Sequence, residues 1–444
     1  MCNILIFAVM LTVLVLAGTG YASASPPDEE WNRTYGGSGI TSVESFQQTA
    51  DAGYILTVKI NPPRNYNAGE NSQYYFFDHI NVLKIGPNGS EQWNRTLDGT
   101  FSNRAISVLE TSDGGYLIAG STSDCNNRDC PDDVWLIKMN MQGQEQWNLT
   151  LGGTDNEEVD FVRQTADGGY ILIGNTNSYY VGTFEIWFVK VDSNGNMQWN
   201  NTFGGIGPDK AYSVNQVPGG YIIAGYTEPH SAGNSDLWLV KTNTKGEELW
   251  NNTFRGMFGG AHSVQQTRDG GYIIAGNTPF NPGHSDFLLV KIDSNGTEQW
   301  YRTFGGGGLE FNPSVRLSPD GGYIIAGKTG SVNSESYDMW LVSTDPDGYV
   351  QWEMTFGGTG QDDVARSVLL APDGGLVVAG DKDWFSEQGT DFWLIKLGGV
   401  PSEPEGGIAP TDGEPIQTPD IPGFGAVVAV MGLLVWVGLA GRRR

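Results

Sequence analysis

The chain has 444 residues, including 63 glycines, and its 25 Lys and Arg residues stand against 51 Asp and Glu, for a net charge of −26. Such an acidic chain lacks the cations that would neutralise nucleic-acid phosphates, which excludes a nucleic-acid partner. The length exceeds that of one ordinary domain, although a repeat array can form a single unit of this size.

The N-terminal segment predicts export. Residues 4–17 form an apolar run, and small residues ending in Ala22-Ser23-Ala24 follow it. This order is typical of a secretory signal peptide with an A-x-A cleavage site, which we place at 1–24, although Lys and Arg are missing from its start. A retained membrane anchor is the alternative.

A repeated WxxT segment runs through the chain. Its spacing falls from 62 to about 50 residues, and it begins at Trp31, Trp93, Trp147, Trp199, Trp250, Trp300 and Trp352. One repeat shows four short segments rich in β-branched and aromatic residues, at 211–217, 221–227, 237–243 and 249–254. Periods of this length made of short strands indicate propeller blades.

The repeat predicts an all-β fold, a seven-bladed β-propeller over 31–397 with four antiparallel strands per blade. The apolar runs are nearly continuous, as expected for a sheet buried on both faces between neighbours. Asp-Gly turns such as 112–115 and 192–195 separate the strands. The recurrent Trp is expected to pack against a neighbouring blade.

The first and last repeats are incomplete in a complementary way. The WxxT segment at 31–35 follows no earlier strands, and the last WLIK segment, 393–396, is followed by no WxxT copy. We therefore expect residues 31–35 to pair beside 391–397 and close the ring, which removes the free edges of a linear array.

The D-x-N-G-x-x-x-W segments at 192–199 and 293–300 resemble the blade signature of quinoprotein propellers, and the blades are also similar to those of WD-repeat and kelch proteins. This resemblance implies a propeller fold and not an activity. The Asp-x-Asn-Gly turns themselves lack the Glu and the flanking helices of an EF-hand, so we interpret them as turns.

Aromatic residues gather in the loops between the second and third strands of several blades. Exposed aromatics beside Asn, Ser and Gly make adaptable binding surfaces for sugars or polypeptides, and packing of the loops onto the sheet is the alternative. The candidate ligand-binding residues are Tyr66, Tyr74, Tyr75, Tyr179, Tyr180, Trp384 and Phe385.

Acidic residues recur where one blade connects to the next. Four of them occupy one repeat position, namely Glu157, Asp209, Glu310 and Asp363. If they ring the mouth of the central channel they could hold a cation such as calcium through water. The alternative is four solvated acids on an acidic protein.

Two further kinds of candidate site involve covalent bonds, namely a disulfide and attached glycans. Cys125 and Cys130 are expected to form a disulfide in an exported protein, with a metal site among neighbouring aspartates as the alternative. Seven Asn-x-Ser/Thr sequons are glycosylation candidates. Their asparagines are Asn32, Asn88, Asn94, Asn148, Asn200, Asn251 and Asn295.

The C-terminal segment predicts anchoring. Residues 398–422 are rich in Pro, Gly and acids and are expected to be a disordered linker, while 424–441 is an uncharged apolar stretch long enough for a membrane helix, followed by three arginines. The order of Pro422-Gly423-Phe424, apolar helix and Arg cluster over 423–444 resembles the PGF-CTERM sorting signal of archaeal surface proteins. That resemblance implies processing by an archaeosortase and replacement of the helix by a lipid.

Enzymatic signals in the sequence are weak. The four histidines are scattered over several blades without metal-ligand spacing, and no nucleophile elbow is present. The sequence favours a non-catalytic propeller on the extracellular face of the cell membrane that binds a glycan, a protein or an envelope component through its loop face. The alternatives are a propeller-scaffold enzyme (a carbohydrate-active hydrolase or lyase, or a quinone-dependent oxidoreductase) and a purely structural surface-layer component.

Overall fold

The structure is a computed structural model, and it describes residues 25–399 with internal gaps. The gaps are 36–39, 62–78, 98–101, 124–130, 179–183, 206, 229–234, 255–258, 279–283, 306–307, 331–335, 358–361 and 385–390. Across the described ranges the chain forms β-strands, and none of it is a helix long and apolar enough to cross a membrane. The signal at 1–24 and the segments after residue 399 lie outside the described ranges.

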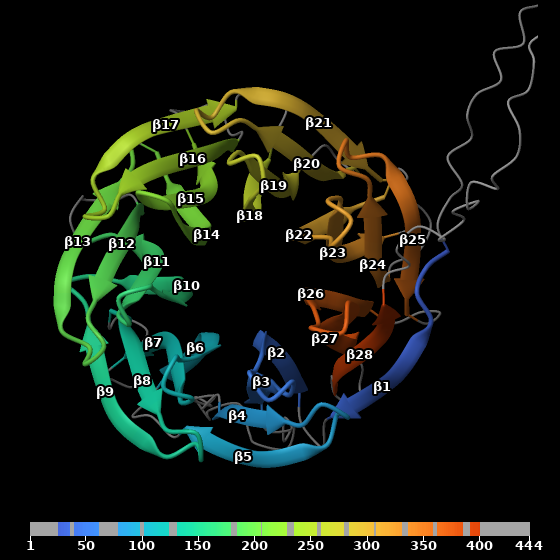
Figure 1. Ribbon diagram of the computed structural model, residues 1–444. Helices are drawn as coiled ribbons and strands as arrows, with labels where there is room; N and C mark the ends of the chain where they lie inside the picture. Colours follow the sequence, from blue (N-terminus) through green and yellow to red (C-terminus); the bar gives the residue numbers. More distant parts are fainter. Residues whose placement is uncertain are drawn as a thin grey trace, which may run out of the picture. The chain divides into compact units, whose positions relative to one another are not determined.

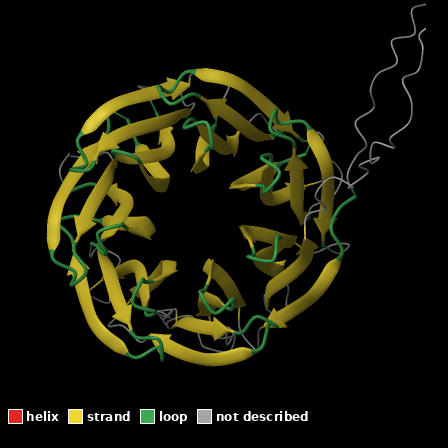
Figure 2. Ribbon diagram, in the orientation of Figure 1, coloured by secondary structure: helices red, strands yellow, loops and turns green. Residues whose placement is uncertain are grey.

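The strands form seven four-stranded antiparallel sheets arranged as a ring (Figures 1 and 2). Blade 1 comprises β2 (Ile40–Gln48), β3 (Tyr54–Asn61), β4 (His79–Ile85) and β5 (Glu91–Leu97). Blade 2 comprises β6 (Ser102–Glu110), β7 (Tyr116–Ser123), β8 (Asp133–Met139) and β9 (Glu145–Leu151). Blade 3 comprises β10 (Glu157–Gln164), β11 (Tyr170–Thr176), β12 (Glu185–Val191) and β13 (Met197–Phe203).

The remaining blades follow the same order. Blade 4 comprises β14 (Asp209–Val217), β15 (Gly220–Thr227), β16 (Asp236–Asn243) and β17 (Glu248–Phe254). Blade 5 comprises β18 (Gly260–Gln266), β19 (Tyr272–Asn277), β20 (Phe287–Ile292) and β21 (Glu298–Phe304). Blade 6 comprises β22 (Glu310–Leu317), β23 (Tyr323–Gly330), β24 (Tyr337–Thr344) and β25 (Val350–Phe356). Blade 7 comprises β26 (Asp362–Leu370), β27 (Gly375–Trp384), β28 (Asp391–Gly399) and, from the N-terminal end, β1 (Glu29–Tyr35).

The predicted closure of the ring by the N-terminal strand is confirmed. Strand β1 pairs antiparallel with β28, with Trp31 opposite Lys396 and Tyr35 opposite Phe392. Tyr35 stacks on Phe392 with ring centroids 4.6 Å apart, and its hydroxyl donates a hydrogen bond to the Gly89 carbonyl oxygen of blade 1. The two ends of the repeat array therefore share one sheet, and no blade has to remain three-stranded.

The hydrophobic core lies between the blades. Strands β7, β11 and β12 are buried along their whole length, as their continuous apolar sequences predict. One cluster joins Leu117 and Leu136 of blade 2 to Tyr170 and Val189 of blade 3, and each further cluster likewise joins two neighbouring blades. Each sheet is thus held by the sheets on either side of it.

The recurrent Trp residues pack against the next blade, as the sequence predicts. The Trp93 ring on β5 meets Tyr116 of blade 2 edge to face at 5.6 Å, and Trp31 on β1 meets Tyr54 of blade 1 at 6.3 Å. Gly143, in the turn after β8, has a φ of 70° and lies against Trp93 so closely that a Cβ there would be 2.9 Å from the indole. The corresponding turn glycines Gly195, Gly246, Gly296 and Gly348 also lie against the Trp of the preceding blade, so a residue without a Cβ makes room for that ring.

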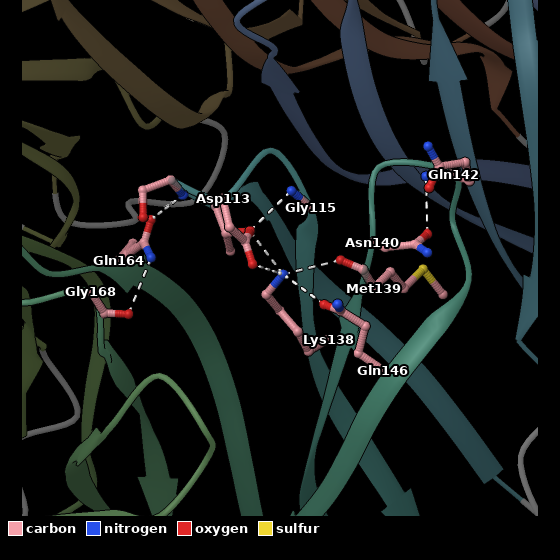
Figure 3. A network of polar contacts seen from close by, with 11 residues as sticks. Asp113, Gly115, Lys138, Met139, Asn140, Gln142, Gln146, Gln164 and Gly168 are labelled. Atoms are coloured by element: carbon pink, nitrogen blue, oxygen red, sulfur yellow. Dashed lines mark hydrogen bonds and ion pairs between the residues drawn. The ribbon is translucent and has the colours of Figure 1, made fainter.

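A buried lysine joins two hairpins in five blades of the described structure, and Figure 3 shows the contacts of the one in blade 2. In blade 2 the Lys138 ammonium lies 3.0 Å from the Asp113 carboxylate in the β6–β7 turn and also donates to the Met139 carbonyl oxygen (3.1 Å) and to Gln146 Oε1 (3.2 Å). The Lys138 side chain is 4% exposed. The same Lys–Asp pair recurs with Lys84, Lys190, Lys291 and Lys396.

Blade 4 keeps the lysine but not its partner. Lys241 lies opposite Trp250, the same register as Lys138 and Trp147, yet the β14–β15 turn is Pro218-Gly219 and contains no Asp. The Lys241 ammonium is buried without a hydrogen-bond partner among the described residues, and burial lowers its pKa. A buried, unpaired charge destabilises the fold.

Lys241→Met is therefore expected to raise the free energy of unfolding by about 1–2 kcal/mol, since it keeps the apolar stem and removes the unpaired ammonium. Chemical denaturation of the mature chain measures the change. Lys138→Met is the matched control, because it breaks an existing pair and should not stabilise. Equal effects of the two variants would contradict this assignment.

Candidate functional site

Most of the loop residues expected to bind a ligand lie outside the described ranges. This holds for Tyr66, Tyr74, Tyr75, Tyr179, Tyr180 and Phe385, while only the backbone of Trp384 is described, at the end of β27. Cys125 and Cys130 also fall in a gap, as do Pro422, Gly423 and Phe424. These assignments stay predictions.

The seven sequon asparagines are all exposed on the described surface. Five of them, Asn32, Asn94, Asn148, Asn200 and Asn251, occupy the same position on the outermost strands of their blades, and Asn88 and Asn295 lie in turns. Exposure satisfies one requirement for glycan attachment. Glycosylation itself stays a prediction.

The four acids at the blade connections are buried within their own blades. Glu157 is 0% exposed and accepts hydrogen bonds from the Gly153 backbone N–H (2.6 Å), from Thr176 (2.7 Å) and from Ser178. Asp209 likewise accepts from the Gly205 N–H at 2.7 Å.

The other two acids follow the same pattern. Glu310 accepts a hydrogen bond from Thr329 at 3.0 Å, and Asp363 is 2% exposed. These carboxylates therefore differ from solvated surface acids. No three His, Cys, Asp or Glu residues in the described ranges gather as metal ligands, so the predicted cation has no shared ligand set there.

The innermost strands carry a β-bulge at one repeat position, and these bulges build a different site. In β10, β14 and β18 the pairing register shifts around Asp160, Tyr212 and His262. Flanking residues such as Val159, Ala211 and Ala261 are buried between blades, whereas the bulged residues are half-buried. A bulge re-aims a side chain out of the regular alternation, so these residues lie on the inner wall of the ring, the half-buried surface of its innermost strands.

Three adjacent blades bring these bulged residues together as one group, which we call the inner-wall cluster: Asp160, Tyr212 and His262. The Tyr212 and His262 rings stack with centroids 5.0 Å apart and planes 19° apart. Asp160 accepts a hydrogen bond from the buried Asn175 amide at 2.8 Å. The cluster therefore combines an aromatic stack from blades 4 and 5 with a carboxylate held at the equivalent position of the neighbouring blade 3.

Half burial shifts the ionisation of all three cluster residues. Burial raises the pKa of Asp160 to about 6, with Lys210 and Arg104 opposing the shift and Glu158 adding to it. Burial lowers the pKa of His262 to about 4, against a hydrogen bond with Asn277, so the imidazole is neutral at pH 7. Burial, together with the neighbouring Tyr226 and Asp160, raises the pKa of Tyr212, which keeps its proton.

The expectation that the histidines are scattered is thus incomplete. His262 comes from a different blade than its neighbours Tyr212 and Asp160, and nothing in the local sequence around it suggests a site. The signal lies in the repeat register: Asp160, Tyr212 and His262 are spaced by the repeat length and occupy a position that holds Ile106 in blade 2.

Comparisons with known proteins bear on the fold. No protein-family model matches the chain, and no curated protein sequence matches it. Among solved structures, a polysaccharide lyase of family PL25, an ulvan lyase, is similar with a TM-score of 0.53 at 14% identity, over 83% of this chain and 97% of that chain.

Two further structures are similar at lower scores. The polysaccharide lyase Uly1 has a TM-score of 0.48 at 10% identity, over 86% of this chain and 94% of its own. The β-propeller domain of the trilobed protease from Pyrococcus furiosus has a TM-score of 0.45 at 9% identity, over 80% of this chain and 95% of its own. At these identities the likeness concerns the fold alone.

Proposed function

We propose that this propeller binds a glycan outside the cell and that the inner-wall cluster is its binding site. The observation that carries the proposal is the Tyr212–His262 stack beside the held Asp160 carboxylate. Sugars present apolar C–H faces and hydroxyl groups, which suit an aromatic face next to a hydrogen-bond acceptor. The half-buried position lowers the competition from water.

Two further considerations support this function. The predicted signal at 1–24 and anchor at 423–444 place the propeller where extracellular glycans occur. A structure of the same fold is that of a polysaccharide lyase, which makes polysaccharides the first ligands to test. Protein or envelope partners bound through the loop face remain the alternative binding function.

Binding to a panel of oligosaccharides, measured by isothermal titration calorimetry with the mature chain, tests the proposal. Tyr212→Ala and His262→Ala are each expected to weaken the best ligand by at least ~10-fold, a typical loss for a central aromatic contact. Tyr301→Ala is the control, because Tyr301 lies 39% exposed on the outermost strand β21. Unchanged affinity in both cluster variants would refute this binding site.

The pH dependence of binding gives a second readout of the same site. Asp160 accepts charge-assisted hydrogen bonds only when it is ionised, and its pKa is about 6, so affinity should fall as the pH drops through 6. In Asp160→Asn the side chain no longer titrates, so the binding affinity should stay nearly constant as the pH drops through 6.

One observation favours a catalytic alternative, a carbohydrate-active lyase. The neutral His262 imidazole can accept a proton, while Tyr212 keeps its own at neutral pH. In β-elimination a base removes the proton next to a sugar carboxyl group and an acid protonates the departing oxygen, so the pair has both capacities. Ultraviolet absorbance of an unsaturated product, lost in His262→Ala and in Tyr212→Phe, would support the lyase over simple binding.

A further inference from the structure

The outermost strand of each blade has one edge without a strand partner. Strands β1, β5, β9, β13, β17, β21 and β25 stand at the end of the strand order in their sheets and form the outer rim of the ring (Figure 1). Among the described strands each of them pairs with one neighbour only. The backbone N–H and C=O groups along such an edge can pair with a strand of another chain. The rim therefore offers edges at which copies of this protein can associate.

Five of these strands carry an asparagine at one shared position. The position follows the recurrent Trp and lies opposite an aliphatic residue of the third strand, as in the pairs Asn94–Leu83 and Asn200–Val189. All five asparagines are exposed, and their blades 7, 1, 2, 3 and 4 are consecutive around the ring. They are Asn32, Asn94, Asn148, Asn200 and Asn251.

Asparagine is an unusual residue for the middle of a strand. It is depleted in β-strands, which favour β-branched and aromatic residues. Blades 5 and 6 show that the strand does not need it, since Tyr301 and Glu353 occupy the equivalent position opposite Val290 and Val342. A residue type that goes against a local preference in five blades indicates a role outside the strand itself.

The contacts of the asparagine amides do not explain this repetition. The Asn32 amide donates to Glu29 at 3.0 Å and the Asn251 amide to Glu248 at 2.6 Å, and both glutamates are exposed. A threonine follows each of the five asparagines by two residues, on the same face of the strand because side chains alternate. What the five positions share is therefore the exposed Asn-x-Thr tripeptide, the acceptor sequence for N-linked glycans.

We propose that the five strand asparagines carry N-linked oligosaccharides and that these glycans form a belt, which shields the outer edges of blades 7, 1, 2, 3 and 4 from other chains. In the attachment step the Asn amide nitrogen forms a bond to the anomeric carbon of an oligosaccharide held on a lipid phosphate. The bond between that carbon and the phosphate oxygen breaks, and the amide proton goes to the released lipid phosphate. The predicted signal at 1–24 exports the chain to the compartment in which exported proteins receive such glycans.

The belt is separate from the inner-wall cluster. The belt lies on the outermost strands of its blades, whereas Asp160, Tyr212 and His262 lie on the innermost strands β10, β14 and β18. Glycans on the belt therefore leave the proposed binding site open. Replacing the belt asparagines should leave oligosaccharide binding unchanged, so failure of the belt and failure of the binding site give different results.

Glycopeptide mass spectrometry of the full chain, produced in a host that N-glycosylates its exported proteins, tests the modification. Each of the five strand asparagines is expected to carry a glycan, and each Asn→Gln substitution should remove the mass of one. Tyr301→Asn and Glu353→Asn create an Asn-x-Thr tripeptide at the equivalent position of blades 5 and 6, so each should add one glycan. Tyr301→Gln and Glu353→Gln are the matched controls and should add none. Unmodified asparagines at the five positions would overturn the proposal.

Sedimentation velocity at equal protein concentration tests the shielding. The chain with all five asparagines replaced by glutamine is expected to form larger species than the wild type from the same host, because its strand edges are bare. Asn88→Gln with Asn295→Gln is the control, since these two asparagines lie in turns. All chains keep the same C-terminal segment, so association through that segment is common to them.

The wild-type sequence from a host without N-glycosylation separates loss of the glycans from the substitutions themselves. It should associate like the five-fold variant, and circular dichroism should show the same fold in both. Equal size distributions for the glycosylated and the bare chains would show that the glycans do not shield the edges.

Discussion

Deleting residues 31–35 is expected to unfold the whole propeller rather than fray one end. The segment supplies most of β1, the outermost strand of blade 7, and pairs with β28 over Trp31 to Tyr35. Its two aromatic rings also pack into the cluster that joins blade 7 to blade 1. Loss of both rings and of the strand ladder is expected to cost on the order of 5 kcal/mol or more, as much as many domains have in total.

The measurement is urea denaturation of the mature chain followed by tryptophan fluorescence and far-ultraviolet circular dichroism. Deleting residues 25–27 is the control, since it spares β1 and the 2.8 Å hydrogen bond from the Gly398 N–H to the Asp28 carbonyl oxygen. If the deletion leaves too little folded protein, Tyr35→Ala tests the same contact, with an expected loss of about 2–3 kcal/mol. A truncated chain as stable as the control would show that the ring does not need its closure.

Removing the aspartate of one lysine pair is expected to destabilise the fold. In Asp113→Ala the Lys138 ammonium stays 4% exposed but loses its carboxylate. Because the Asp113 side chain is 58% exposed and solvent screens the pair, the expected cost is about 1–2 kcal/mol, less than for a fully buried pair. The double variant Asp113→Ala with Lys138→Met should recover most of the loss, because the unpaired charge goes with it. Denaturation of the two variants and the wild type measures this coupling.

The Lys138–Asp113 pair also predicts that the free energy of unfolding falls in acid. Partial burial would raise the Asp113 pKa, but hydrogen bonds from Thr111, Lys138 and Gly115 outweigh it and lower the pKa to about 2. An acid whose pKa is lower in the folded state stabilises the fold above its unfolded value, near 4, and that stabilisation is lost as the pH falls toward 2. The Asp113→Ala variant should lose less stability over this window than the wild type. An equal loss would show that Asp113 does not titrate as described.

The sequence alone determined the architecture of this protein. The recurrent Trp and the Asp-Gly turns repeat at nearly constant spacing, and the apolar runs of the strands are nearly continuous. A blade that packs between two neighbouring blades buries such strands on both faces. The sequence also determined the hydrogen bonding within the turns. Asp192, for example, accepts hydrogen bonds from the Asn194 and Asn196 backbone N–H groups at 2.8 and 2.9 Å. The complementary half-repeats at 31–35 and 393–396 determined the closure.

Only the tertiary structure decided what the inner strands display. The four blade-connection acids look like free carboxylates in the sequence, but the fold buries all four, and Glu157 and Asp209 accept hydrogen bonds from backbone N–H groups of their own connections. His262 looks isolated in the sequence, but ring formation stacks it on Tyr212 from the preceding blade.

The physical reason for this division is the range of the interactions. Strands, turns and blades follow from hydrogen bonds and apolar spacing within about fifty residues. This unit occurs seven times in the sequence. The character of the inner wall depends on side chains that a β-bulge turns away from the regular alternation and that meet only across blades. Their burial, ionisation and pairing arise when the ring closes.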